Sequence, residues 1–151
     1  MNIGSKEVVI KTPTFGELHV PEEKIIRFQE AIPGFPAVHE FALLEFDEVK
    51  PFQYLQSLGD PPVALLIVNP FLFAPDYRFD LSARDMEDLQ AGGEGEVSVF
   101  AVATIPSDPA EATINLMAPV LINAKARCGK QVILLEADHS VRYPLFGPGR
   151  R

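Results

Sequence analysis

Two asparagines and a proline interrupt the most apolar stretch of this 151-residue chain, which makes the two amides candidates for a chemical site. Asn115 and Asn123 stand on either side of Pro119 in ATINLMAPVLINAKARCGKQVILL, residues 112–135. Counted with the two-residue period of a strand, the even positions from 114 to 124 are all apolar, and the polar side chains fall on odd positions. We therefore predict one long strand, in which the asparagines lie about 26 Å apart at roughly 3.3 Å per residue, too far for one active site. Their amides are expected to bond backbone left unpaired near Pro119, because proline lacks an N–H and belongs at an edge or a local break in pairing.

Residues that perform catalysis in other proteins are present but are not grouped in the sequence. His19, His39 and His139 are far apart, and no cysteine or histidine pair has the spacing of a metal site. The glycine-rich GGEGE at 92–96 carries carboxylates that would repel phosphate, so it predicts a loop that ends a helix. The single cysteine, Cys128, cannot form an internal disulfide and is interpreted as a bystander. The sequence therefore predicts no catalytic residues, no metal site and no cofactor.

Charge is distributed unevenly along the chain. Residues 1–124 carry 7 basic and 19 acidic side chains, whereas residues 125–151 carry 6 basic and 2 acidic ones. An acidic body repels phosphate backbones, so we expect no direct binding to nucleic acid; a basic protein partner is compatible, as is plain solubility. No apolar run approaches the roughly 18–20 residues that cross a membrane, and the first residues lack a secretory signal. We expect a cytoplasmic protein with no membrane partner.

The remaining pattern predicts an all-β, mainly antiparallel fold: a small β-barrel-like single domain over residues 1–146, with a flexible tail at 147–151. One or two short helices are expected. The first is 50–60; the second, 80–93, has Ser82 as N-cap and Asp85 three residues later, a pair that only resembles a capping box. The predicted strands are 7–11, 15–20, 24–29, 41–49, 63–68, 77–81, 97–105 and the long stretch above, followed by a hairpin at 127–130 and a strand at 131–136.

The segment NPFLFAPDYRF, residues 69–79, concentrates aromatic rings between prolines. Such loops form rigid protein-binding surfaces, because aromatic rings bury much area at low entropic cost. The same rings would equally close one end of a barrel, and both roles can hold together. The predicted partner-binding residues are Phe71, Phe73, Asp76, Tyr77 and Phe79.

Four motifs, in this order and spacing, resemble the FliW family of flagellar assembly factors: AIPGFP with FALLEF, PFQYLQSLGD, NPFLFAPDYRF, and the stretch from 112 to 135. The resemblance extends from Phe15 to Arg142, and Ala31 departs from it where glycine is expected. The structural signature residues are Pro33, Gly34, Phe35, Asn115, Leu116, Pro119, Asn123 and Gln131.

The resemblance implies a non-enzymatic cytoplasmic regulator that is a monomer when free. Members of the family bind CsrA, a translational regulator that silences flagellin mRNA, and relieve its repression from a site away from the RNA-contacting surface. Flagellin competes by occupying the FliW protein until it is exported. An edge left free near Pro119 would accept a flagellin segment.

Two alternatives stay open at the level of the sequence. One is a dedicated flagellin chaperone without a translational role. The other is a flavin-binding small-barrel enzyme, which would need a basic phosphate site that the acidic body does not offer.

Overall fold

The computed structural model describes residues 6–135 and 138–146, and the predicted tail at 147–151 lies outside them. Eleven strands and one α-helix are present in the described residues, together with five short 3₁₀ turns. The elements are β1 (Glu7–Thr12), β2 (Gly16–Pro21), β3 (Ile25–Phe28), β4 (Glu40–Glu45), β5 (Gln53–Ser57), β6 (Ala64–Val68), α1 (Ala83–Asp88), β7 (Ser98–Thr104), β8 (Thr113–Ile114), β9 (Val120–Asn123), β10 (Cys128–Gln131) and β11 (Tyr143–Pro144). The prediction of a mainly antiparallel β-barrel with one or two short helices is confirmed.

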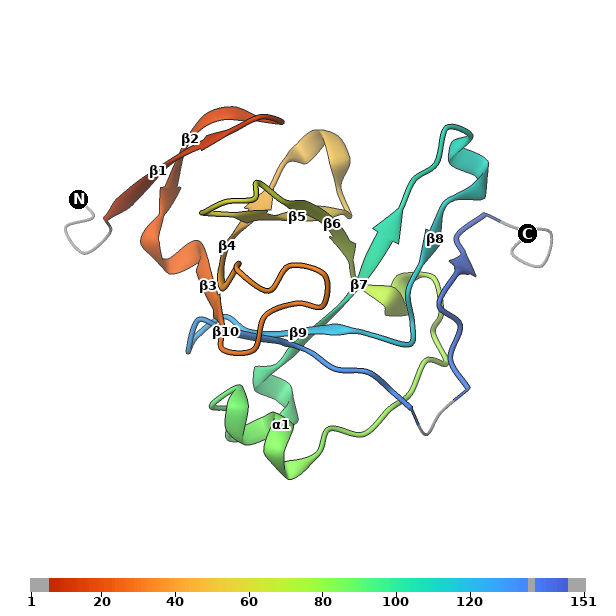
Figure 1. Ribbon diagram of the computed structural model, residues 1–151. Helices are drawn as coiled ribbons and strands as arrows, with labels where there is room; N and C mark the ends of the chain where they lie inside the picture. The colour runs from red at the N-terminus through yellow and green to blue at the C-terminus, as the bar shows by residue number, and fades with distance from the viewer. Residues whose placement is uncertain (1–5, 136–137, 147–151) are drawn as a thin grey trace.

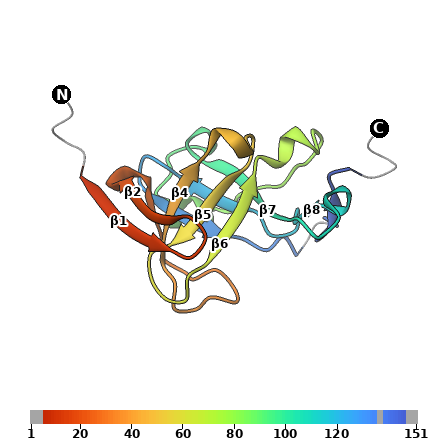
Figure 2. The ribbon, with the colours of Figure 1, turned by 90° about the horizontal axis from the view of Figure 1, so that it is seen from above.

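Seven strands close into a barrel in the order β7-β6-β5-β4-β3-β10-β9, because β9 pairs with β7 as well as with β10. Among the strand pairs of the described residues, only β3 and β10 run parallel. Figure 1 shows the closed ring of strands, with β8 and β11 extending from β7 on the side away from the β1–β2 hairpin. In the view from above, Figure 2, the hairpin lies beside β4 and β5, where it covers their outer face. Helix α1 lies below the barrel, next to β10.

The barrel interior is filled by apolar side chains from most of its strands. Phe28 and Phe41 are fully buried, and their rings meet edge to face with centroids 5.3 Å apart. Gly129 lies against the first of these rings, and a Cβ atom built at Gly129 would come within 2.5 Å of Phe28 Cζ. Glycine at 129 is therefore a consequence of close packing between neighbouring strands.

One predicted helix is confirmed and the other is wrong. The helix predicted within 80–93 exists as the short α1, and its cap is a full capping box: Asp85 N donates to Ser82 Oγ at 3.0 Å, and Ser82 N donates to Asp85 Oδ2 at 3.2 Å. The helix predicted at 50–60 is strand β5 instead. Pairing with β4 on one side and β6 on the other fixes the extended conformation of this segment. The local sequence does not show which strands will lie beside it.

The long strand predicted through Pro119 is also wrong, because residues 115–119 form a break between β8 and β9. Asn115 Oδ1 organises this break by accepting from Met117 N at 2.9 Å and Ala118 N at 3.1 Å. The placement of Pro119 at a local break, and the use of Asn115 for unpaired backbone beside it, are confirmed.

Asn123 also bonds backbone, but in a different place from the one predicted. It is 1% exposed, and its Nδ2 donates to Leu89 O at 2.9 Å and to Gln90 O at 3.3 Å, just after α1. Its Oδ1 accepts from Ala126 N at 3.3 Å. The hairpin turn is at 124–127 rather than 127–130, so Asn123 fastens both this turn and the end of the helix to the barrel.

Two further predicted strands are shorter or absent. Residues 77–81 are extended but pair with no strand, and β10 ends at Gln131, with residues 132–135 continuing outside the regular ladder. Together these segments form the lower part of the molecule in Figure 1, between α1 and β11.

Candidate functional site

Three rings of the predicted binding segment form one stack, the aromatic patch, made of Phe71, Tyr77 and Phe79. The Tyr77 ring lies in the middle, 5.7 Å from Phe71 and 5.3 Å from Phe79 between centroids. Its hydroxyl donates to Leu116 O at 2.6 Å, and burial raises its pKa well above the ordinary value. Tyr77 is only 4% exposed, so it supports the patch from beneath. The segment therefore closes one part of the core while presenting some of its side chains to solvent.

The exposed part of this segment is aliphatic as well as aromatic. The 3₁₀ turn Pro70–Leu72 starts at Asn69, whose Oδ1 accepts from Phe71 N at 2.9 Å. This turn leaves Phe71 partly exposed and Leu72 56% exposed. A hollow of about 190 Å³ lies beside Phe71, with walls from the patch and from Val97 and Val99. An apolar side chain of a partner would fit such a hollow.

Phe73 and Asp76 do not join the stack. The Phe73 ring packs on Phe52 with centroids 6.2 Å apart, and the Tyr143 hydroxyl donates to Phe73 O at 3.3 Å. Asp76 is exposed in the turn between the rings. Of the five predicted binding residues, Tyr77 is therefore buried beneath the patch and Phe73 is packed on Phe52. Phe71 and Asp76 are exposed, and Phe79 is half-buried.

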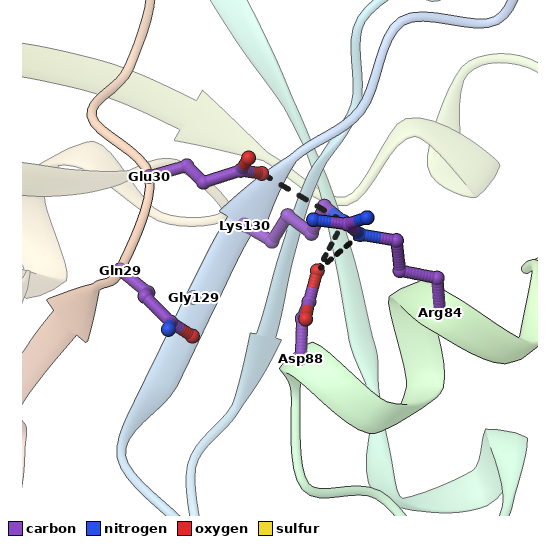
Figure 3. Close-up of a pocket in the computed structure, with 6 residues that line it drawn as sticks. All are labelled: Gln29, Glu30, Arg84, Asp88, Gly129 and Lys130. Atoms are coloured by element: carbon purple, nitrogen blue, oxygen red, sulfur yellow. Dashed lines mark hydrogen bonds and ion pairs between the residues drawn. The ribbon is translucent and has the colours of Figure 1, made fainter.

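A second grouping, the Lys130 cluster, contains Lys130, Asp85, Asp88 and Glu30. Lys130 Nζ is 2.6 Å from Asp88 Oδ2, 2.9 Å from Asp85 Oδ1 and 3.8 Å from Glu30 Oε1. In Figure 3, Lys130 extends from β10 toward α1, where Asp88 meets both Lys130 and Arg84, while Glu30 approaches from the opposite side. Glu30, Asp88 and Lys130 line a small cavity of about 110 Å³, and the ion pairs of the cluster join the helix to the barrel.

The charges of the Lys130 cluster are balanced against one another. Burial alone would raise the pKa of Asp85, but hydrogen bonds from Lys130 and Ser82 outweigh this effect and lower it. The Lys130 hydrogen bond also lowers the pKa of Asp88. Burial would lower the pKa of Lys130, but its hydrogen bonds to the two aspartates raise it instead. A phosphate would have to displace these carboxylates from Lys130, so the cluster does not fit the phosphate site that a flavin needs.

Residues capable of catalysis are scattered over the described part of the chain. His39 Nδ1 lies 2.9 Å from Phe28 O, His139 Nε2 lies 3.0 Å from Arg78 O, and His19 is on the β1–β2 hairpin. Among the described residues, no three acidic, histidine or cysteine side chains are placed to hold a metal ion.

Cys128 is half-buried on β10. Burial raises the pKa of its thiol, and Gln90 Nε2 lies 3.2 Å from its sulfur. A raised thiol pKa leaves less reactive thiolate at neutral pH.

No helix within residues 6–135 and 138–146 combines the length and apolar character that crossing a membrane would require.

Four signature residues, distant in sequence, line one surface groove of about 360 Å³. They are Pro33, Phe35, Asn115 and Gln131. Gly34 between the first two has a φ of 96°, a conformation that glycine adopts readily and that turns the loop here. The exposed Val141 and Arg142 complete the rim. Sequence reasoning treated these positions as fold determinants only, and no local signal could have shown that closure of the barrel brings them together.

The other signature residues serve the interior. Leu116, Pro119 and Asn123 are buried, and Gln131 Nε2 donates to Ala118 O at 3.0 Å beside the break in the strand. Some signature residues therefore pack in the interior, others hydrogen-bond backbone groups, and others line the groove.

Comparison with known proteins gives consistent matches across the chain. Residues 8–145 match a family model described as FliW protein. The chain is 41% identical over 138 residues to the flagellar assembly factor FliW of Caldicellulosiruptor saccharolyticus, covering 91% of this chain and 90% of that protein. It is 36% identical over 137 residues to the protein of the same name from Geobacillus kaustophilus, covering 91% and 94% respectively. A crystal structure of the flagellar assembly factor FliW matches with a TM-score of 0.86 at 35% identity, covering 93% of this chain and 98% of that chain.

Proposed function

Because this chain belongs to the FliW family, we propose that it is a non-enzymatic flagellar assembly factor that binds the translational regulator CsrA. Binding relieves the repression of flagellin mRNA, and flagellin competes for the same protein. The observation that carries the proposal is the family match over residues 8–145, which includes the barrel, α1 and the aromatic patch. The scattered histidines and the balanced charges of the Lys130 cluster agree with a role in binding rather than in catalysis.

The exposed edge of the aromatic patch is the surface we propose for partner contact. Leu72 offers an exposed aliphatic side chain next to Phe71, which lines the hollow, and the buried Tyr77 anchors the patch by its hydrogen bond to Leu116 O. Leu72→Asp is therefore expected to weaken binding about tenfold or more, since a charge would replace an apolar contact. Val9→Asp is the matched control: Val9 is 53% exposed but lies on the β1–β2 hairpin, on the far side of the barrel in Figure 1. Both variants should unfold cooperatively at nearly unchanged stability.

Charge suggests how a partner bound away from the RNA surface opposes RNA binding. The first 124 residues contain 19 acidic side chains against 7 basic ones, so a bound protein of this kind adds a negative field near CsrA. We expect this field to repel phosphate, and its effect to fade as salt shortens the Debye length from about 30 Å at 0.01 M to about 8 Å at 0.15 M. If the antagonism per bound protein is the same at low and moderate salt, the electrostatic part of the proposal is wrong.

Co-purification distinguishes the proposed function from its nearest alternative. Tagged protein is incubated with purified CsrA, with flagellin, and with both together. We expect a complex with each partner alone, and loss of CsrA as flagellin is added. Capture of flagellin but never of CsrA would instead indicate a dedicated flagellin chaperone. A yellow colour of the purified protein would indicate a bound flavin and would support the flavin-enzyme alternative.

A further inference from the structure

Strand β1 is an edge strand with one side that no other strand uses. It pairs only with β2, and Figure 2 shows β1 at the outside of the molecule, with β2 between it and β4. Neither a proline nor a bulge interrupts β1, which pairs with β2 one to one from Glu7 to Thr12. An uninterrupted open edge is a template for a further strand.

The register of the hairpin shows which backbone groups of β1 face the open side. Glu22 N donates to Lys6 O at 2.7 Å, so this opposed pair is a hydrogen-bonded one. Bonded and non-bonded pairs alternate in an antiparallel ladder, and therefore Glu7, Val9 and Lys11 direct their N–H and C=O groups away from β2. Among the described residues, no hydrogen bond uses the backbone of these three positions.

The side chains of the same three residues carry a pattern of charge along the edge. Glu7 and Lys11 have opposite charges, and Val9, which is 53% exposed, lies midway between them. All three point away from the barrel, since the side chains between them pack against it. Within the described part of the chain, Glu7 has His19 Nδ1 at 3.8 Å as its only ion-pair neighbour, and Lys11 forms no ion pair.

This edge is complementary to itself. When two copies of β1 run antiparallel with Val9 opposite Val9, each Glu7 stands opposite the Lys11 of the other copy. All three outward residues then belong to hydrogen-bonded pairs, and opposite charges that face one another across two strands attract. A shift by two residues in either direction loses one of these pairs and places a charge opposite valine. Parallel pairing in register would place like charges side by side, so charge selects the antiparallel arrangement.

We propose that β1 pairs with β1 of a second copy of this chain, so that the two hairpins form one antiparallel sheet across a two-fold axis at Val9. Because the same surface is used on both copies, association stops at the dimer. A contact based on one strand of 6 residues belongs with the small, weak interfaces below about 1,200 Å². The monomer that the family resemblance implies is therefore the dilute form, and Val9→Asp remains a valid control for partner binding measured in dilute protein.

Sedimentation equilibrium at low salt tests the dimer with the protein alone. Between about 10 μM and about 1 mM, the average mass should rise from 16.6 kDa toward twice that value. Glu7→Lys and Lys11→Glu should each weaken association at least about tenfold, because each places like charges opposite one another. An equal mixture of the two variants should associate again, since every lysine of one then faces a glutamate of the other. Glu111→Lys, the same charge change at an exposed position just before β8, should associate like the unchanged protein.

A cysteine at the two-fold axis tests the register. In a Cys128→Ser background, Val9→Cys places two thiols on directly opposed residues, with Cα atoms about 5.5 Å apart, which is within the range of a disulfide. Mild oxidation at high protein concentration should link this variant into dimers at least about tenfold faster than Ile105→Cys in the same background. Ile105 is the matched control because it is 46% exposed and lies just after β7, outside the hairpin.

Three results would overturn the dimer. The first is a mass that stays the same over the whole concentration range. The second is association that neither charge variant weakens, since the copies would then meet at another surface. The third is a mixture of the two charge variants that stays monomeric, since charge pairing across β1 would then be wrong. Each variant should unfold in urea at the same midpoint as the unchanged protein in dilute solution, which separates loss of pairing from loss of folding. None of these results affects the proposed function, because no partner is present.

Discussion

Replacing Asn123 with alanine is expected to destabilise the fold more than any other asparagine substitution in the long apolar stretch. The side chain is 1% exposed and takes part in three hydrogen bonds to backbone: Nδ2 donates to Leu89 O at 2.9 Å and to Gln90 O at 3.3 Å, and Oδ1 accepts from Ala126 N at 3.3 Å. One bond has good geometry and two are long, so their loss costs about 1–2 kcal/mol, and the buried groups left without partners add about 1 kcal/mol. We expect the free energy of unfolding to fall by about 2–3 kcal/mol.

Urea unfolding followed by circular dichroism measures this change, with Asn115→Ala as the matched control. Asn115 also accepts two backbone hydrogen bonds, at 2.9 and 3.1 Å, but it lies in a half-buried turn where water can replace the lost acceptor. Its loss should cost only about 1 kcal/mol. Equal effects of the two substitutions, or a loss below about 1 kcal/mol for Asn123→Ala, would refute the reasoning that burial decides the cost.

Three further predictions concern packing, a buried hydroxyl and pH. Gly129→Ala should lower stability by about 1–3 kcal/mol in urea unfolding, because its Cβ would meet Phe28, whereas Gly95→Ala, with no heavy atom within 4 Å of its Cβ, should have little effect. Tyr77→Phe removes the donor of a 2.6 Å hydrogen bond and should cost about 1–2 kcal/mol with the barrel intact by far-ultraviolet circular dichroism. Lys130 lowers the pKa of two aspartates, so its ion pairs stabilise the fold above about pH 4 and lose this effect as pH falls through the lowered values. Lys130→Met should therefore be less stable than the unchanged protein at about pH 7, and the difference should shrink at about pH 3; a constant difference would contradict this assignment.

Local signals in the sequence predicted those parts of the fold that depend on neighbouring residues. Short apolar runs separated by proline and glycine predicted the barrel class, and Ser82 with Asp85 predicted the start of α1. The helix predicted at 50–60 rested on Pro51 and Gly59, which stand where a helix would begin and end, and it is wrong because two neighbouring strands impose the extended form of β5. The alternation of apolar and polar residues through Pro119 led to the wrong prediction of one continuous strand. A turn held by Asn115 interrupts the strand but keeps the apolar side chains on either side of it buried.

The candidate binding surfaces were only partly visible in the sequence. The aromatic segment was evident from its composition, but only the structure separates buried Tyr77 from exposed Leu72. A further groove, between residues 78–82 and 130–135, lies beside two segments that were predicted as strands, 77–81 and 131–136, whereas in the structure the first forms no strand and β10 ends at Gln131. Its walls are about 50 residues apart in the chain, so neither local pattern nor charge could have placed them side by side.

We propose as the central function that this protein releases CsrA from flagellin mRNA and that flagellin reverses this release. Fluorescence anisotropy of a labelled flagellin leader RNA, bound to CsrA at low salt, measures it in one titration. Adding the protein should release the RNA as it binds CsrA, and adding flagellin afterwards should restore the RNA complex. RNA that stays bound to CsrA at saturating protein, or release that flagellin does not reverse, would contradict the account.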